Sequence, residues 1–394
     1  MAKDKLSQTF NKPVKNVINI GRFTLNTRIA WLIGISLFLG SGALIYSAVQ
    51  PRTTINNPQT TNNNPIYIIN NPPPTAPGEK LSDAEKAKAQ VVVEQSRKAT
   101  EANPNDATAW TNLGEALRRT GNLPGAQQAQ EKALQINSKL TEAKLGLVLI
   151  KKDQGKTAEV IPELRTIAEE GKSASAYFSL GYSLSEQKDF SGSEAAYRQS
   201  IALDPNNEGA HINLGLALYN QGKLEDAIVS FQTAIRINPN LPSAHSSLGV
   251  ALYNQGQLEN AIVSFQTAIR INPNLPSAHN NLGFALYNQG KLEDAIVSYQ
   301  TALRIKPNDA HVHNDLGNVL KEQGKLEDAI ASYQTAIRIN PNLAEAHANL
   351  GLAFKKQGKK SDAIAQFQQA RSLYQQKGDT KKVADIDRLI QELS

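Results

Sequence analysis

From Leu81 onward, apolar and small residues recur with the spacing of amphipathic helices. A first helical stretch runs to Ala102, where the turn-forming residues Asn103-Pro104-Asn105-Asp106 end it. Further along, Leu224 to His245 returns as Leu258 to His279 with one change, Asp226 to Asn260, so the pattern has a period of 34 residues. A helical pattern with this period predicts an all-α fold in which similar helix pairs stack on one another.

The period divides the helical region into eight repeats. We place them at 107–140, 141–173, 174–207, 208–241, 242–275, 276–309, 310–343 and 344–377, together forming an array over 107–377. A helix within 79–106 precedes the array, and a capping helix within 378–394 follows it. Because a single repeat cannot bury its apolar face, the stability of such an array comes from the packing of neighbouring repeats.

The residues that recur in each repeat resemble those of the tetratricopeptide repeat (TPR) family. In the fourth repeat they are His211, Leu214, Gly215, Leu218, Gly222, Ala227, Phe231, Ala234 and Pro239. The resemblance implies a right-handed superhelical solenoid whose first helices line a concave groove. The array also resembles the repeat region of O-linked N-acetylglucosamine transferases, but the catalytic domain of those enzymes would have to follow it. We therefore expect no enzyme activity.

Each recurring residue has a structural reason. Gly222 follows a first helix, where a left-handed C-cap favours glycine. Pro239 ends a second helix because the residue before a proline avoids the α region. Gly215 is small where two helices approach closely, and Phe231 fills the space between neighbouring repeats. The second repeat departs most from the pattern, and its Pro162 predicts a late helix start or an irregular repeat.

The first part of the chain predicts a membrane anchor. Residues 29–49 are apolar or small throughout, which is long enough for a transmembrane helix. The basic segment 1–28 precedes them, so the positive-inside rule places the N-terminus in the cytoplasm and the repeat array on the other side of the membrane. The alternative is a cleaved secretory signal, which would leave the array secreted.

Two features near this span concern the spacing and association of chains. Residues 50–78 are rich in Pro, Asn and Thr, and this composition predicts a disordered linker that separates the array from the membrane. Within the span, small residues four apart, such as Ser36 and Gly40, favour self-association through the transmembrane helix, although such residues are ordinary in membrane helices.

Composition narrows the chemistry further. The chain has no Cys, which excludes disulfides, thiol catalysis and sites that require Cys ligands. Its net charge of +6 is located within residues 1–52. Since the remaining residues are neutral in sum, the array has no excess positive field to attract phosphate, and we expect no nucleic-acid binding.

Five histidines occupy the fourth position of consecutive repeats: His211, His245, His279, His313 and His347. Residues one repeat apart lie too far from each other to share a metal ion, whose bonds to nitrogen are about 2 Å long. We therefore interpret the histidines as packing residues in place of the aromatic residue that is usual in the family. No Walker loop, nucleophile elbow or metal-binding helix motif is present, so we expect neither metal nor cofactor.

The candidate site is the groove that the TPR resemblance implies. In the family, the sixth position of each repeat is often an Asn that binds the backbone of an extended ligand. Here that row includes Asn112, Asn213, Ser247, Asn281, Asp315 and Asn349. A local role between helices is the equal alternative. A second candidate row consists of tyrosines, each followed by an asparagine: Tyr219-Asn220, Tyr253-Asn254 and Tyr287-Asn288. Stacked tyrosines suit a binding surface, but they also fit recent duplication of three similar repeats.

These observations predict a membrane-anchored scaffold for protein–protein interaction. Its groove would bind extended or helical segments of partner proteins and so assist the assembly or organisation of membrane or envelope complexes. The alternative is an accessory subunit of polysaccharide or glycan-modifying machinery.

Overall fold

A computed structural model describes residues 17–20, 23–26 and 83–394, which fall into two compact units, Met1–Asn62 and Asn63–Ser394. In the first unit, β1 (Val17–Ile20) and β2 (Phe23–Asn26) pair antiparallel, with Val17 opposite Asn26. The transmembrane helix expected over 29–49 and the linker expected over 50–78 lie outside the described residues. Within the described part of the chain, no helix combines the length and hydropathy that crossing a bilayer requires.

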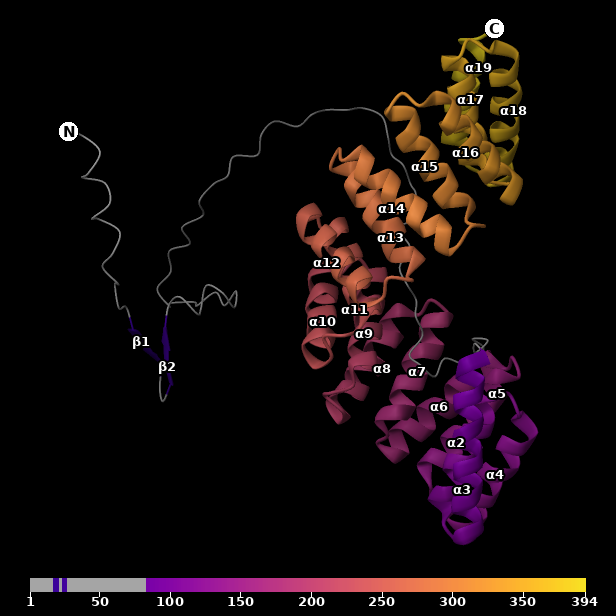
Figure 1. Cartoon of the computed structure of the whole chain (residues 1–394). Helices are drawn as coiled ribbons and strands as arrows, with labels where there is room; N and C mark the ends of the chain where they lie inside the picture. Colours follow the sequence, from indigo (N-terminus) through magenta and orange to yellow (C-terminus); the bar gives the residue numbers. More distant parts are fainter. Residues whose placement is uncertain (1–16, 21–22, 27–82) are drawn as a thin grey trace, which may run out of the picture. The chain divides into compact units, whose positions relative to one another are not determined.

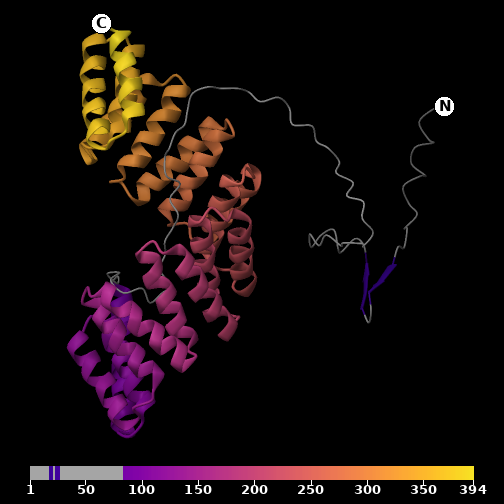
Figure 2. The same cartoon turned by 180° about the vertical axis from the view of Figure 1, so that it is seen from behind.

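The described part of the second unit consists of eighteen helices, α2 to α19, which stack as consecutive antiparallel pairs (Figure 1). The view from behind shows the same succession from α2 to α19 (Figure 2). The all-α solenoid predicted from the sequence is therefore confirmed for residues 83–394. The helices are α2 (Asp83–Ala102), α3 (Ala107–Arg119), α4 (Leu123–Ile136), α5 (Thr141–Asp153), α6 (Thr157–Gly171), α7 (Ala174–Glu186), α8 (Phe190–Leu203), α9 (Glu208–Asn220), α10 (Leu224–Ile237), α11 (Pro242–Asn254), α12 (Leu258–Ile271), α13 (Pro276–Asn288), α14 (Leu292–Ile305), α15 (Ala310–Glu322), α16 (Leu326–Ile339), α17 (Ala344–Lys356), α18 (Lys360–Gln376) and α19 (Thr380–Gln391).

Glycine and proline end the helices as the sequence predicts. Gly222 follows α9 with a φ of 77°, which is the left-handed region that glycine adopts without steric cost. Helix α10 ends at Ile237, and Asn238 before Pro239 is extended. The third repeat is the exception among the eight, because Lys188 occupies the corresponding position with a φ of 62°.

In the third to eighth repeats, the large aromatic residue of the second helix packs on the glycine of the first helix in the same repeat. A Cβ atom added to Gly215 would lie 2.6 Å from the ring of Phe231, and Gly249 has the same relation to Phe265. Phe231 was expected to fill the space between neighbouring repeats, and in the structure it also packs on the first helix of its own repeat. The ring also belongs to the continuous core that joins neighbouring repeats. Close packing of ring on backbone explains why the glycine recurs.

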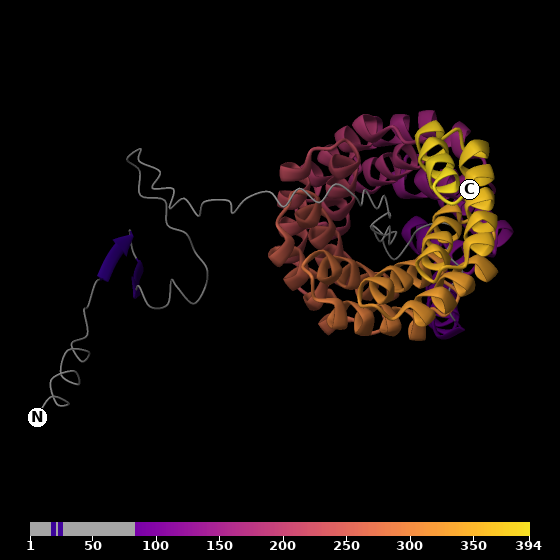
Figure 3. The same ribbon diagram turned by 90° about the horizontal axis from the view of Figure 1, so that it is seen from above.

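First and second helices lie on different sides of the array. Successive first helices contact one another, as α9 and α11 or α15 and α17 do, whereas successive second helices do so far less. Because the first helices lie closer together, the array curves towards them. The first helices therefore form the concave side, called here the inner face, and the second helices form the outer face. The view along the array shows the helix pairs arranged around a common centre (Figure 3).

The late helix start predicted for the second repeat is wrong. Helix α6 begins at Thr157, and Pro162 lies inside it. A proline at this point removes one backbone hydrogen bond. The loss is tolerated because Val160, Leu164 and Ala168 are fully buried on both sides of Pro162 and hold the helix against its neighbours.

Candidate functional site

The sixth-position row predicted as a groove lies along the first helices, on the inner face. Its exposure changes along the array. Asn112 is exposed in the first repeat and Asn349 is half-buried in the last, whereas Asn213, Ser247, Asn281 and Asp315 are buried in the middle repeats. The structure therefore places the central part of the row inside the wall formed by α9, α11, α13 and α15.

Buried polar atoms without a partner gather in the fifth and sixth repeats. Ser246 is 0%, Ser247 1% and Asn280 4% exposed. The hydroxyl oxygens of both serines and Oδ1 of Asn280 have no hydrogen-bond partner in the described chain. Leaving a buried polar group unpaired costs about 1 to 3 kcal/mol, so such groups are rare and call for an explanation. Ser246 and Asn280 are neighbours of the predicted row that the sequence analysis did not select.

The end of the row shows how neighbouring repeats can satisfy such groups. Asn349 Nδ2 donates to Asn314 Oδ1 at 2.9 Å, across one repeat junction. The partner comes from the fifth position of the preceding repeat. Local pairing, the alternative reading of the amide row, is therefore realised at this junction between α15 and α17.

The tyrosine row lies one to two turns further along the same helices and is half-buried. Asn254 Nδ2 donates to the Tyr219 hydroxyl at 2.6 Å, and the ring of Tyr253 contacts that of Phe284 with centroids 5.4 Å apart. Burial raises the pKa of Tyr219 and Tyr253. For Tyr287, burial and a hydrogen bond with Glu322 raise the pKa. These phenols therefore remain neutral at physiological pH.

The three asparagines that follow the tyrosines mainly bond within their own helices. Asn220 Nδ2 donates to the Leu216 carbonyl at 2.8 Å, Asn254 Nδ2 to Val250 at 3.0 Å, and Asn288 Nδ2 to Phe284 at 2.8 Å. All three asparagines are exposed, and these hydrogen bonds use the amide nitrogen and not the amide oxygen. A ligand would thus meet acceptors here more readily than donors.

The structure gives the histidine row a role that the sequence analysis missed. Nε2 of His245 lies 3.0 Å from the carbonyl of Pro239, six residues earlier, and His279, His313 and His347 repeat this contact with Pro273, Pro307 and Pro341. In the first repeat, Trp110 Nε1 donates to the Pro104 carbonyl at 2.9 Å. A ring N–H at the fourth position therefore fastens the turn between two repeats. The signal in the sequence was the constant spacing between this residue and the preceding proline.

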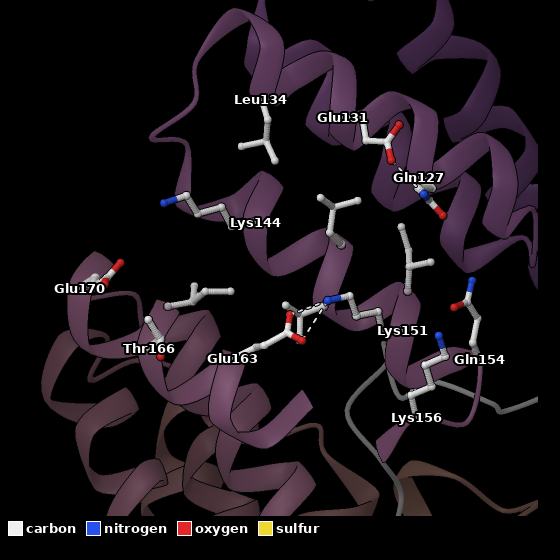
Figure 4. A pocket seen from close by; sticks show the side chains of 14 residues that line it. Gln127, Glu131, Leu134, Lys144, Lys151, Gln154, Lys156, Glu163, Thr166 and Glu170 are labelled. Atoms are coloured by element: carbon white, nitrogen blue, oxygen red, sulfur yellow. Dashed lines mark hydrogen bonds and ion pairs between the residues drawn. The ribbon is translucent and has the colours of Figure 1, made fainter. Parts of the chain in front are cut away.

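A cavity of about 620 Å³ lies among α4, α5 and α6, away from every predicted site residue (Figure 4). Leu134, Leu147 and Ile167 provide apolar lining, and Lys151 forms an ion pair with Glu163 at 2.7 Å. The cavity coincides with the divergent second repeat, where Lys144 replaces the ring found at the fourth position elsewhere. Within the described residues, no group of His, Asp and Glu side chains is arranged to hold a metal ion.

Family comparison agrees with the recurring residues. Profiles described as TPR repeat match residues 181–222, 215–256, 251–290, 285–324 and 317–358. Profiles described as tetratricopeptide repeat match residues 97–128 and 346–382. The chain therefore belongs to the tetratricopeptide repeat proteins, a class whose repeats generally serve as non-catalytic interaction scaffolds. A search of curated proteins finds no match.

One solved structure supports the fold, and two others are similar over part of the chain. The Cut9–Hcn1 hetero-tetramer of APC/C matches with a TM-score of 0.52 and 16% identity, covering 79% of this chain and 59% of that one. PilF of Pseudomonas aeruginosa matches with a TM-score of 0.48 and 18% identity over 55% of this chain and 96% of its own. YrrB, described as a TPR protein with an unusual peptide-binding site, matches with a TM-score of 0.40 and 23% identity over 46% and 95%.

Proposed function

We propose that this protein is an interaction scaffold whose inner face binds an extended segment of a partner protein at the fifth and sixth repeats. The partner's backbone would supply the hydrogen bonds that Ser246, Ser247 and Asn280 lack. Because these side chains are buried in the free array, binding would include a separation of α11 and α13 that exposes them. Serine and asparagine side chains offer both donors and acceptors, so they suit a peptide backbone of varied sequence. The half-buried tyrosines beside them would contribute rigid apolar contact.

One observation carries the proposal: the unpaired polar atoms of Ser246, Ser247 and Asn280 are buried on adjacent first helices, α11 and α13. Ser183 on α7 is the other described serine that is buried without a partner, whereas the buried serines of the second helices are paired. Ser230 Oγ donates to the Asp226 carbonyl at 3.0 Å, and Ser264 Oγ to Asn260 at 2.9 Å. Ser230 and Ser264 lie on second helices and bond within their own helix, whereas Ser246 and Ser247 lie on a first helix and have no partner.

The test is a double variant, Ser246→Ala with Ser247→Ala. Removing two buried unpaired hydroxyls raises the unfolding free energy of the ligand-free protein, by about 1 kcal/mol or more in total. The same change weakens partner binding. Binding is read by placing a photo-crosslinking amino acid at position 284 of the full-length chain in native membranes and identifying the captured proteins by mass spectrometry.

Ser264→Ala is the matched control, because it removes a buried serine hydroxyl that already has a partner. It should leave the captured set unchanged and slightly lower the melting temperature. A crosslinker at exposed position 199 on α8 reports non-specific capture. Capture at position 284 that survives the double serine variant, or equals capture at position 199, would overturn the proposal.

We further propose that residues 29–49 anchor the protein in a membrane, with segment 1–28 in the cytoplasm and the array on the other side. The apolar run and its basic flank support this placement. The scaffold would then assist complexes of that membrane or envelope, and small residues in the span would favour association of two chains. A single introduced cysteine at position 199, probed in intact cells with a membrane-impermeant maleimide, reports the side: labelling supports export, and its absence contradicts it.

The alternative role, as an accessory subunit of glycan-modifying machinery, remains a prediction. In the crosslinking experiment it would appear as capture of a glycosyltransferase or a polysaccharide synthase at position 284.

A further inference from the structure

Three valines form an exposed stripe on the outer face. Val229 on α10, Val263 on α12 and Val297 on α14 are 60%, 60% and 61% exposed, and each occupies the same position in its repeat. The flanking repeats have Ala195 and Ala331 there. The valine stripe is therefore confined to the fourth, fifth and sixth repeats. Aligned apolar side chains that remain in water indicate an interaction surface more than scattered single ones do.

Charges of opposite sign border the valine stripe at the two ends of the second helices. The acidic border is Glu225, Asp226, Glu259, Glu293, Asp294, Glu327 and Asp328, and the basic border is Arg236, Arg270, Arg304 and Arg338. All of these side chains are exposed. Gln255 and Gln323 donate hydrogen bonds to Glu225 and Glu293, but these amides leave the carboxylate charge in place. None of the four arginines forms an ion pair with a described residue.

The charges and the valines share one face of each second helix. At 100° per residue, Glu225 lies about 40° and Arg236 about 20° around the helix from Val229, and the two are about 16 Å apart along the axis. Lys223 lies about 120° away and pairs with Glu194 at 2.7 Å. Lys291 and Lys325 occupy the same place in their repeats, so these lysines do not cover the face.

We propose that this face binds the same face of a second copy of the chain, with a two-fold axis that runs along the valine stripe. Rotation about that axis reverses the direction of the helices, so the acidic border of one copy meets the basic border of the other at both edges. Each valine then faces its own counterpart. A two-fold axis parallel to the helices would instead bring like charges together, which costs free energy.

The size of the patch predicts a weak dimer. Three second helices about 10 Å apart, with a face about 16 Å long, offer roughly 500 Å² per copy. The total of roughly 1,000 Å² lies at the lower end for specific interfaces, where complexes form transiently. The inner face stays free in this arrangement, so dimerisation and the proposed peptide binding are independent.

Because the chain contains no Cys, one introduced cysteine gives a clean test. Val263→Cys in the full-length chain places two thiols on the two-fold axis, so mild oxidation should yield a disulfide-linked dimer on a non-reducing gel. Val91→Cys is the control, since Val91 is 56% exposed on α2 and lies outside the patch. Equal dimer yields for the two variants, or none for Val263→Cys, would refute the arrangement.

A charge swap tests the orientation. Arg270→Glu with Arg304→Glu makes two of the four basic positions acidic, and Glu259→Lys with Glu293→Lys makes two of the seven acidic positions basic. Each variant, carrying Val263→Cys, should lose most of its homodimer crosslinking, at least fivefold. Mixing the two should restore a crosslinked heterodimer, because the substituted positions of one copy again face substituted positions of opposite charge in the other. If the mixture gives no more crosslinking than either variant alone, the two-fold arrangement is excluded.

Discussion

At the scale of single residues, backbone conformation is decided most clearly at the end of the first helices. Gly290 ends α13 with a φ of 80°, and a Cβ atom added there would meet nothing within 4 Å. Its role is therefore conformational. Lys188 has nearly the same φ, 62°, although a side chain makes this conformation about 1 to 2 kcal/mol less favourable.

Lys188→Gly should consequently raise the unfolding free energy by about 0.5 to 1 kcal/mol, because the relief of strain exceeds the added entropy of the unfolded chain. Gly290→Ala is the reciprocal control and should lower it by about 1 kcal/mol. Urea denaturation followed by circular dichroism measures both. A loss of stability in Lys188→Gly would show that the lysine side chain contributes more than its backbone conformation costs.

At the scale of helices, the junctions between repeats carry recurring polar contacts. Gln221 Nε2 donates to Glu194 at 2.9 Å, and Gln255 and Gln323 donate to a different glutamate of the preceding second helix, Glu225 and Glu293. Glu194 also accepts from Lys223 at 2.7 Å and pairs with Arg198. The Lys223 bond, together with those of Gln221 and Arg198, lowers the pKa of Glu194 to about 2.

A carboxylate whose pKa is lowered by folding stabilises the folded state above its unfolded pKa, near 4.5, and the contribution is lost as the pH falls towards 2. Glu194→Gln should therefore lower the unfolding free energy at pH 7 by about 1 to 2 kcal/mol, and by much less at pH 2.5. Thermal denaturation of both proteins across this range measures the difference. A deficit that does not change with pH would exclude the ionised pair as its cause.

The sequence predicted helix ends and packing residues well because their causes are local. Gly222 and Pro239 act through their own backbone, and Gly215 is small because of a ring in the same repeat. Pro162 was placed wrongly because buried neighbours outweighed its local preference. The burial of Ser246 and Ser247 could not be predicted, since it depends on how closely successive first helices approach. That distance results from small rotations accumulated over several repeats.

At the scale of the whole molecule, the apolar core is continuous through the middle repeats and divided in the first ones. One cluster joins residues from Tyr197 to Ala353, whereas the first repeats hold two smaller clusters, around Leu117 and around Leu164. The cavity among α4, α5 and α6 lies at this divided end. Each repeat contacts only its neighbours, so local stability should follow the local core.

Hydrogen exchange should therefore show earlier opening of α3 to α6 than of α9 to α16, with protection of their slowest amides lower by at least tenfold. The two groups of helices serve as internal controls for each other in one experiment, read by mass spectrometry of peptic fragments. Uniform protection along the array would mean that it unfolds as a single cooperative unit despite the divided core.

The contact between His279 and Pro273 is the same as that between His245 and Pro239, and the residues around them are almost identical. A copy of residues 242–275 inserted after itself would meet 276–309 at one end, as the original does. At the other end it would meet a second helix that differs from the original's neighbour at one residue, Asn260 in place of Asp226. The array is thus modular in the engineering sense: it can be lengthened or shortened in whole steps without new surfaces having to be fitted. The length of the array is therefore set by the number of repeats, in steps of 34 residues.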